Sequence, residues 1–401
     1  MRFPSTPQIE QEIARVRSLT RDLLAGYVAW GPELKYGDTY QAVYGDVFDF
    51  VNFRMESVES CLTLLDDSKV SDSLALCRSL LENYMVFALI CRGRKYVMVQ
   101  DLTSLDTEKF KEELAKAEAA WQKSATDGTT SLIAVRKYPD ANRHIEYVYD
   151  DIRFDDGEPA PVSIYYFHLD EFNPEAMRLK DEDYFEYYPM PPDVRRSDAK
   201  YRREQLARYR YILSYDSLKR SLHLNGLLDR AALLRLEAHY TFLGQYLHPT
   251  KGAMRRLRND DNWYDGRPQI GMDRSYRQSA ELLASVYVLQ LAISFIEEIV
   301  NYFDAQPKRD VVFSGTTHLH ELLDDAKSST SYFWFLTNEP SEWDRYNWCV
   351  HFASKEDIES WGGYLNSPTE DIKFNKSILG NLESALRRVS NVKAGDYIPP
   401  I

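Results

Sequence analysis

The stretch AALLRLEAHYTFLGQYLHPTKGA, residues 231–253, is the best starting point for predicting the fold of this chain. Its apolar side chains recur at steps of three and four residues, which predicts a helix with one buried stripe. They are Leu233, Leu236, Tyr240, Leu243 and Leu247. Gly244 has no side chain, so a neighbouring helix or a ligand has room to approach closely there. Pro249 then ends the helix and directs the imidazole of His248 off its end.

Further helices flank this stretch on both sides. The same periodicity predicts them at residues 7–30, 38–65, 71–92, 198–223 and 273–303. Helices of this kind bury their apolar stripes against one another, so residues 38–92 and 200–303 are expected to form one antiparallel bundle. Helix 273–303 is highly apolar, but charged residues interrupt it and no uncharged run reaches the ~20 residues that a bilayer requires. We therefore expect a bundle helix here and no membrane span.

Two regions break the helical pattern. In the first, strands are expected at 95–102, 144–154 and 162–172, a charged helix at 106–122, and a linker at 180–200. The second follows a boundary at residues 306–307, with strands expected at 310–314, 331–337 and 347–353 and helices at 318–326, 355–365 and 375–389. The predicted fold is mainly α. It consists of bundle helices in residues 1–92 and 198–304, an inserted α+β unit with a β-hairpin in 93–197, and a small C-terminal α+β domain in 305–401.

Charge and cysteine content limit the class of protein. The 401-residue chain carries a net charge of −13, which argues against broad binding to phosphate backbones but leaves room for a small basic pocket. The four cysteines have no Cys-x-x-Cys spacing, and the N-terminal MRFPSTPQIEQEI lacks the apolar segment of a signal peptide. We therefore expect a reduced, cytoplasmic protein.

Arg78 and Glu82 lie one helical turn apart beside an apolar stripe. A surface pair of this kind contributes only ~0.3–0.5 kcal/mol, and arginine before glutamate is the weaker order. This favours a further partner on another helix, such as Arg54 or a histidine. Two interpretations remain open: an ion pair that fixes the register of the helices, or a catalytic or ligand-binding role.

Histidines and basic residues supply the other candidate sites. His318 and His320 precede several acidic residues, but they diverge on a helix and no matching Cys or His cluster completes a metal site, so we expect neither a metal nor a cofactor. The segment KGAMRRLR, residues 251–258, is a dense basic run that begins three residues after His248. It is either a solvated loop that balances the acidic NDDNWYDG after it or a phosphate-binding segment. The phosphate-binding candidates are Lys251, Arg255, Arg256 and Arg258. The glycines form no P-loop and no dinucleotide fingerprint.

Two segments resemble the HEPN-like helical proteins of bacteria. They are CRSLLENYMVFAL (residues 77–89) and YTFLGQYLHPT (residues 240–250), followed by a long apolar helix. The similarity is to the branch with an Arg-Ser-x-x-Glu helix and a later helix that ends in His-Pro, and it covers residues 38–92 and 200–303. It implies a protein of phage-defence or toxin–antitoxin systems, metal-independent cleavage of RNA, and dimerisation. Arg78 and Glu82 match the helix signature, but the usual arginine upstream of the histidine is replaced by Phe-Leu-Gly, so only His248 matches that motif.

The function expected from these features is a metal-independent RNA endonuclease. His248 is the candidate general base or acid, and the arginine that stabilises phosphate charge would be Arg78, Arg54 or Arg255. His239 is the weaker histidine candidate. The competing expectation is a non-catalytic interaction or sensor protein within a defence complex, which the acidic charge favours. The expected partners are RNA, a protein from the same system and a second copy of the chain.

Overall fold

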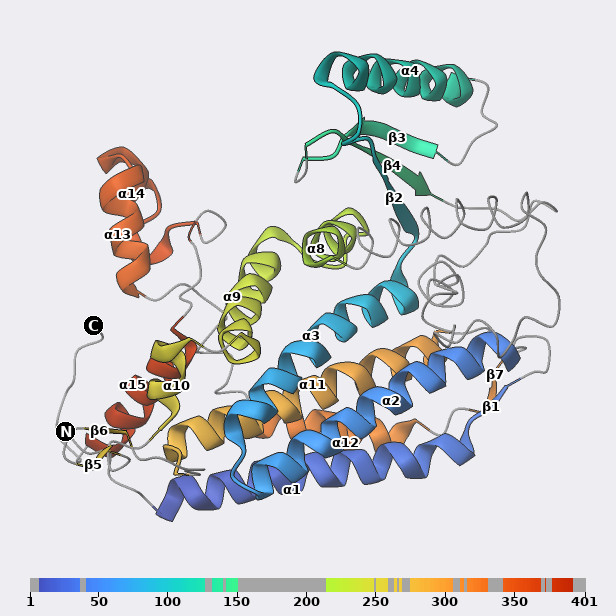
Figure 1. Ribbon diagram of the computed structural model, residues 1–401. Helices are drawn as coiled ribbons and strands as arrows, with labels where there is room; N and C mark the ends of the chain where they lie inside the picture. The colour runs from blue at the N-terminus through green and yellow to red at the C-terminus, as the bar shows by residue number, and fades with distance from the viewer. Residues whose placement is uncertain are drawn as a thin grey trace. The chain divides into compact units, whose positions relative to one another are not determined.

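The structure is a computed structural model with two compact units (Figure 1). It describes residues 7–36, 41–126, 132–139, 142–150, 214–248, 250–258, 263–264, 267–268, 275–305, 311–313, 316–330, 342–368, 372 and 377–391. The first unit is Met1–Tyr84 together with Asp229–Ile401, and the second is Met85–Leu228. Helix α3 (Val70–Arg92) continues from the first unit into the second.

The described part of the first unit is mostly helical. Its long helices, besides α3, are α1 (Pro7–Trp30), α2 (Gln41–Asp66), α9 (Arg230–Leu247), α11 (Gln278–Asp304) and α12 (Thr317–Ser329). Its shorter helices are α10 (Lys251–Leu257), α13 (Glu342–Phe352), α14 (Lys355–Ser360) and α15 (Ile378–Asn391), with single 3-10 turns at Gly31–Glu33 and Tyr364–Asn366. Its short strands form two antiparallel pairs, β1 (Lys35–Tyr36) with β7 (Val311–Phe313) and β5 (Trp263–Tyr264) with β6 (Arg267–Pro268).

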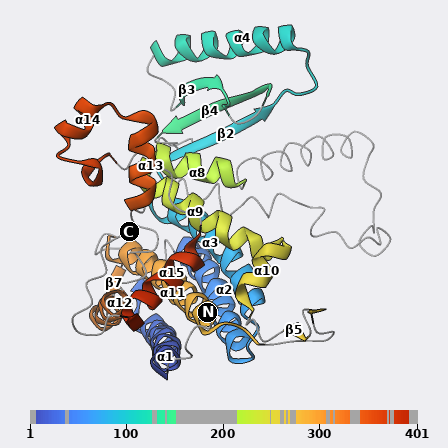
Figure 2. The ribbon, with the colours of Figure 1, turned by 90° about the vertical axis from the view of Figure 1, so that its left-hand side faces the viewer.

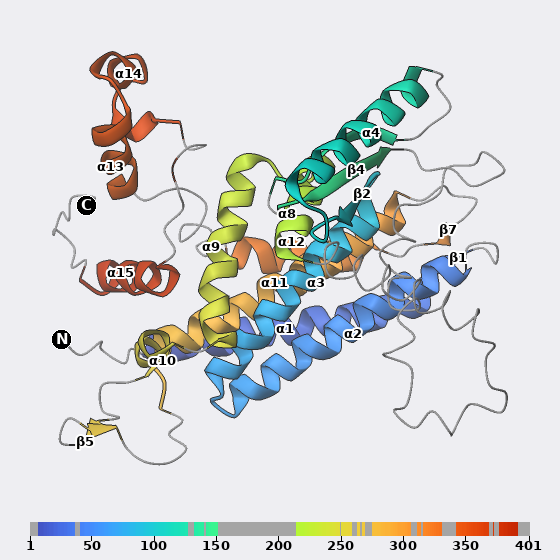
Figure 3. The ribbon, with the colours of Figure 1, turned by 45° about the horizontal axis from the view of Figure 1, so that its top comes forward.

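α11 forms the core of the first unit, because it is apolar on nearly every side. α1 runs parallel to it (Figure 3). Near the start of the pair, Arg17 Nε donates to Ser285 Oγ at 3.2 Å, and near its end the rings of Trp30 and Phe303 lie 6.0 Å apart. The apolar stripe of α1 faces this core, since Val16 and Leu23 are fully buried.

The two other helices of this bundle, α2 and α12, run antiparallel to α1 and α11. α2 returns along α1, where Tyr27 donates to Asn52 Oδ1 at 2.9 Å. α12 returns along α11, because His320 near its start meets Asp304 at 2.8 Å and Thr330 after its end accepts from Gln290 Nε2 at 3.0 Å. The predicted helical bundle is confirmed, but it is not antiparallel throughout, because α1 and α11 run parallel.

Two described helices, α3 and α11, are long and apolar enough to cross a membrane by length and composition alone. The most apolar window of α11 is 89% buried inside the protein, as expected for the central helix of a bundle. The corresponding window of α3 is 50% buried.

The described part of the second unit is a three-stranded antiparallel sheet between two helices. The strands are β2 (Lys95–Asp101), β4 (His144–Asp150) and β3 (Leu132–Lys137), in that spatial order. Helix α4 (Thr107–Thr126) covers one face, where Phe110 packs on Val135 and Ile145. Helix α8 (Tyr215–Leu224) lies against the other face, where Leu224 joins the cluster of Val97, Val99 and Tyr138 (Figure 2). Neighbouring side chains of a strand point to opposite faces of the sheet, so one set packs on α4 and the other on α8.

The mainly helical fold with a small α+β unit is confirmed, and three details differ. Residues 347–353, predicted as a strand, lie mostly in α13, where Trp348 and Phe352 contact each other one turn apart. α8 belongs with the inserted sheet, because Leu224 packs on that sheet. Residues beyond 305 join the bundle: β7 pairs with β1, and α12 packs on α1 and α11. The predicted strands at 162–172 and 331–337 and the linker at 180–200 lie outside the described residues.

Candidate functional site

Arg78 is buried where α3 meets α9. Its side chain reaches Tyr240, so that the guanidinium carbon lies 3.1 Å from the centre of the ring. Its Nη1 forms an ion pair of 2.7 Å with Glu82 Oε1, and the Tyr240 hydroxyl donates to the same carboxylate oxygen at 3.2 Å. Arg78 is only 6% exposed, whereas the Glu82 side chain is 40% exposed. The three residues therefore form a cluster that is buried at the arginine and open to solvent at the carboxylate.

Gly244 completes this arrangement. It lies one turn after Tyr240, and a Cβ added to it would lie 3.7 Å from Arg78 Nε. The group that approaches this glycine is therefore Arg78, at an ordinary van der Waals distance from where a Cβ would lie. The sequence predicts a close approach at Gly244 but not that Arg78 makes it.

The partners of Arg78 and Glu82 differ from those expected. The two residues bind each other and Tyr240, while Arg54 lies on α2 with its guanidinium carbon 5.8 Å from the Phe50 ring centre. Burial raises the pKa of Tyr240, the charge of Arg78 lowers it and that of Glu82 raises it. The geometry is that of a cation between a ring and a carboxylate, which fixes α9 against α3.

His248 lies at the C-terminal end of α9, as the proline after it predicts. Its backbone N–H donates to Gly244 O at 3.1 Å, and its φ and ψ of −117° and 80° are no longer helical. The imidazole is exposed, and no described residue forms a hydrogen bond or ion pair with it. It is therefore accessible to a ligand.

α10 begins three residues after His248 and carries most of the basic run. Thr250 caps it by accepting from Ala253 N at 3.3 Å, and Met254 lies 3.5 Å from Ser71 Oγ at the start of α3. Lys251, Arg255 and Arg256 are exposed. Arg258 is only partly exposed, and its carbonyl accepts from Arg277 Nε at 2.9 Å. Three of the four predicted phosphate-binding residues thus have solvent-accessible side chains.

The structure does not join the candidate catalytic residues into one cluster. Arg78 and Glu82 lie together at Tyr240, and no hydrogen bond or ion pair in the described part of the chain connects either to His248. An arginine that is 94% buried against a ring has little surface to offer a phosphate. Among the described residues, the cations that follow His248 most closely in the chain are those of α10.

His239 is unsuited to acid–base chemistry near neutral pH. Its Nδ1 lies 2.8 Å from the Tyr287 hydroxyl, and the two rings meet edge to face. Burial, and then the charge of Arg235, lower the pKa of His239 to about 3. It is a neutral structural residue above that pH.

The remaining histidine pair lies on α12, as the helical interpretation predicts. His320 contacts Asp304 at 2.8 Å, and His318 lies 3.8 Å from Glu321. Among the described residues, no group of three or more His, Cys, Asp and Glu side chains is placed to hold a metal ion.

A pocket of about 170 Å³ lies between α9, α10 and the first turn of α15, and sequence reasoning missed it. Its polar lining consists of Tyr246, Arg256, Arg277, Ser377 and Glu383. Arg277 Nη1 forms an ion pair of 3.3 Å with Glu383, which also accepts from Ser279 Oγ at 3.0 Å. Arg277 and Glu383 are 106 residues apart, so no local pattern in the sequence announces the pair.

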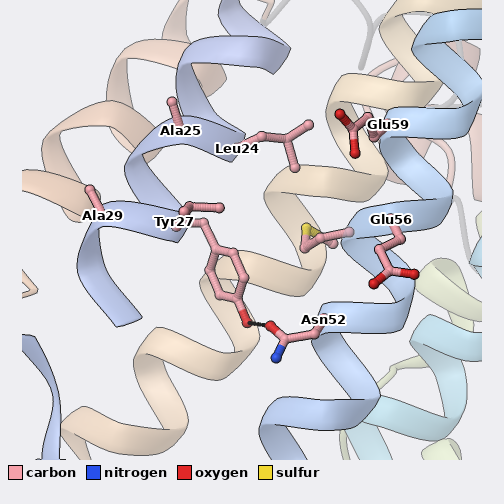
Figure 4. Close-up of a pocket in the computed structure, with 9 residues that line it drawn as sticks. Leu24, Ala25, Tyr27, Ala29, Asn52, Glu56 and Glu59 are labelled. Atoms are coloured by element: carbon pink, nitrogen blue, oxygen red, sulfur yellow. Dashed lines mark hydrogen bonds between the residues drawn. The ribbon is translucent and has the colours of Figure 1, made fainter. Parts of the chain in front are cut away.

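A shallow groove of about 590 Å³ lies between α1 and α2 (Figure 4). Its floor is apolar, with Leu24, Ala25 and Val28 from α1 and Met55 from α2. Glu56 and Glu59 line it from the side of α2, and Tyr27 donates to Asn52 across it. Val28 is 71% exposed to solvent, which is high for a large apolar side chain.

A second missed cluster lies in the inserted unit. Glu146 on β4 is 0% exposed and binds Arg136 on β3 at 2.7 Å and Arg220 on α8. It connects one face of the sheet to α8. Its flanking sequence reads as an ordinary strand, so nothing marks the glutamate as buried.

No protein-family model, curated protein or solved structure matches this chain.

Proposed function

We propose that this protein is a HEPN-like bacterial ribonuclease that binds RNA where α9 ends and α10 begins. The observation that carries the proposal is the exposed imidazole of His248 at the end of α9, followed in the chain by the exposed cations Lys251, Arg255 and Arg256 of α10. Exposed lysine and arginine side chains bind phosphate groups, and histidine transfers protons near neutral pH. A homo-oligomeric state and a role in phage defence or a toxin–antitoxin system belong to the same proposal and rest on the sequence resemblance. A cytoplasmic location also belongs to it and rests on the cysteine pattern.

The reaction follows from these groups without a metal ion. His248 takes the proton of a ribose 2′-hydroxyl while its oxygen attacks the adjacent phosphorus. The bond from phosphorus to the 5′ oxygen breaks, leaving a 2′,3′-cyclic phosphate on one fragment and, once water protonates the leaving oxygen, a 5′-hydroxyl on the other. The α10 cations stabilise the charge that builds up on the phosphate.

Arg78 and Glu82 take a positioning role in this proposal. Their cluster with Tyr240 fixes the register of α9 against α3, and His248 lies two turns beyond Tyr240 on the same side of α9. Loss of Arg78 would therefore lower cleavage by displacing the histidine, not by removing a phosphate contact.

The test is cleavage of labelled RNA in EDTA by the full-length chain. Wild type should release fragments that end in a cyclic phosphate, His248→Ala should lose at least ~100-fold in rate, and Lys251→Ala should bind RNA more weakly. His318→Ala is the matched control, because it removes an exposed histidine from a different helix. Full activity in His248→Ala, or no cleavage by wild type, would overturn the proposal.

The groove between α1 and α2 favours a second candidate function, that of a non-catalytic interaction protein. An apolar floor beside Glu56 and Glu59 fits a partner helix with an apolar face flanked by lysine or arginine. A helical probe peptide of leucine and lysine should bind wild type, and its glutamate counterpart should not. In the double variant Glu56→Lys and Glu59→Lys the preference should reverse. Equal binding of both peptides would argue against the groove.

A further inference from the structure

The pocket between α9, α10 and α15 has a positive balance of charge. Arg256 and Arg277 line it against one carboxylate, that of Glu383, which leaves one positive charge in excess. Glu383 is itself bound by Arg277 and by Ser279 Oγ. Arg256 has no acidic partner among the described residues.

Tyr246 gives this pocket an unused hydrogen-bonding group. It is only 5% exposed and lines the pocket, yet no described residue forms a hydrogen bond with its hydroxyl. The hydroxyl oxygen is not fully enclosed, so a ligand in the pocket can reach it. Burial raises the pKa of Tyr246 and the charge of Arg256 opposes this shift, so the phenol stays protonated and available as a donor near a guanidinium.

The first turn of α15 lines the same pocket through Ser377, Leu379 and Gly380. The first backbone bond of this helix runs from Asn381 N to Ser377 O, so the amides before Asn381 have no partner within the helix. Together with the helix dipole, such amides favour an anion. The volume of about 170 Å³ is far above the ~10–15 Å³ that one water molecule requires.

We propose that this pocket binds a phosphate monoester, with Arg256 and the Tyr246 hydroxyl as its donors beside the first turn of α15. His248 does not line the pocket, although Arg256 belongs both to it and to the proposed RNA-binding cations, so the inference goes beyond the proposed cleavage site. The group that enters it is either the terminal phosphate of an RNA strand or the phosphate of a small metabolite.

The first experiment is calorimetric titration of the full-length chain with inorganic phosphate. Wild type should bind one phosphate per chain. Arg256→Gln should weaken binding at least ~10-fold, and Tyr246→Phe, which removes only the hydroxyl, should weaken it at least ~3-fold. Arg21→Gln is the matched control, because it removes a half-exposed arginine charge from α1, away from the pocket lining and from the proposed RNA-binding cations. Absence of saturable binding to wild type, or unchanged affinity in Tyr246→Phe and Arg256→Gln, overturns the assignment.

Further titrations identify the source of the phosphate. Tighter binding of a 5′-phosphorylated RNA oligonucleotide than of its 5′-hydroxyl form assigns the pocket to an RNA end. Equal binding of the two, with binding of adenosine monophosphate that Tyr246→Phe weakens, assigns it to a small ligand. Since His248 does not line the pocket, phosphate binding by His248→Ala should match wild type, and the pocket stands even if no RNA is cleaved.

Discussion

The guanidinium of Arg78 lies against the face of the Tyr240 ring, 3.1 Å from its centre, and this contact joins α3 to α9. Because Arg78 is buried, the ring replaces solvent that the cation would otherwise have. Glu82 completes the cluster from the exposed side. Substitution of each of the three residues should therefore lower the free energy of unfolding by a different amount.

The ring face of Tyr240 is predicted to matter more than its hydroxyl. Tyr240→Leu should lower the free energy of unfolding by about 2 kcal/mol, since a desolvated cation–π contact is lost. Tyr240→Phe keeps the ring and should cost about 1 kcal/mol or less, as should Glu82→Gln, because Glu82 is half-exposed. Urea unfolding followed by circular dichroism measures all three. Equal losses for Leu and Phe would show that the ring does not hold the cation.

Gly244 is predicted to tolerate a methyl group but nothing larger. A Cβ would make an ordinary contact with Arg78 Nε at 3.7 Å, and alanine favours a helix by up to ~1 kcal/mol over glycine, so Gly244→Ala should be neutral or stabilising. Gly244→Leu should displace Arg78 from Tyr240 and cost about 2 kcal/mol or more. Thermal melting of the two variants compares them. A leucine variant as stable as the alanine variant would mean that Arg78 does not need this space.

Local pattern explains which parts of this architecture are predictable. The periodic stripes of α1, α9 and α11 and the alternation in β2 and β4 each require only neighbouring residues. All five elements form in the predicted regions, although α11 begins at Gln278 instead of residue 273. Residues 347–353 mislead, because tryptophan, valine and phenylalanine at alternate positions suit a strand and Trp348 with Phe352 also suits one helical turn. The residue at which a helix or strand ends next to a loop is the hardest feature to predict from periodicity. The apolar stripe of α8 shows that it is a helix but not that it packs on the inserted sheet.

The candidate site is predictable in its residues but not in its contacts. Arg78, Glu82 and His248 are all visible in the sequence as polar groups beside apolar stripes. That Tyr240 lies on Arg78, or that Arg277 meets Glu383 at the α10–α15 pocket, depends on the packing of helices far apart in the chain. No spacing rule within one helix contains that information.

The buried His239 should make the free energy of unfolding of the bundle depend on pH in the acidic range. Its pKa in the folded protein is about 3, below the ordinary value of 6.5, so the unfolded chain binds a proton between these values that the folded chain does not. Its contribution to stability is therefore complete above pH ~6.5 and falls as pH drops toward 3, by up to ~1.4 kcal/mol per pH unit. His239→Gln keeps a hydrogen-bonding group for Tyr287 without titrating. The stability difference between wild type and this variant should shift by about 2 kcal/mol between pH 6.5 and 4.5. Carboxylates titrate in both proteins and cancel, so a difference that stays constant with pH would contradict the assignment.

Glu146 is predicted to hold the second unit together. Its carboxylate is fully buried between Arg136 and Arg220, so Glu146→Gln leaves two cations without their counter-charge and should cost about 3–5 kcal/mol. Arg136→Gln is the matched comparison, because the Arg136 side chain is 44% exposed and its loss should cost only about 1 kcal/mol. Native-state hydrogen exchange reports the two units separately. In Glu146→Gln, amides of α8 and β4 should lose protection while those of α1 and α11 keep theirs, because the latter belong to the other compact unit. Unchanged exchange in α8 would mean that Leu224 and its apolar contacts, not the buried carboxylate, attach this helix to the sheet.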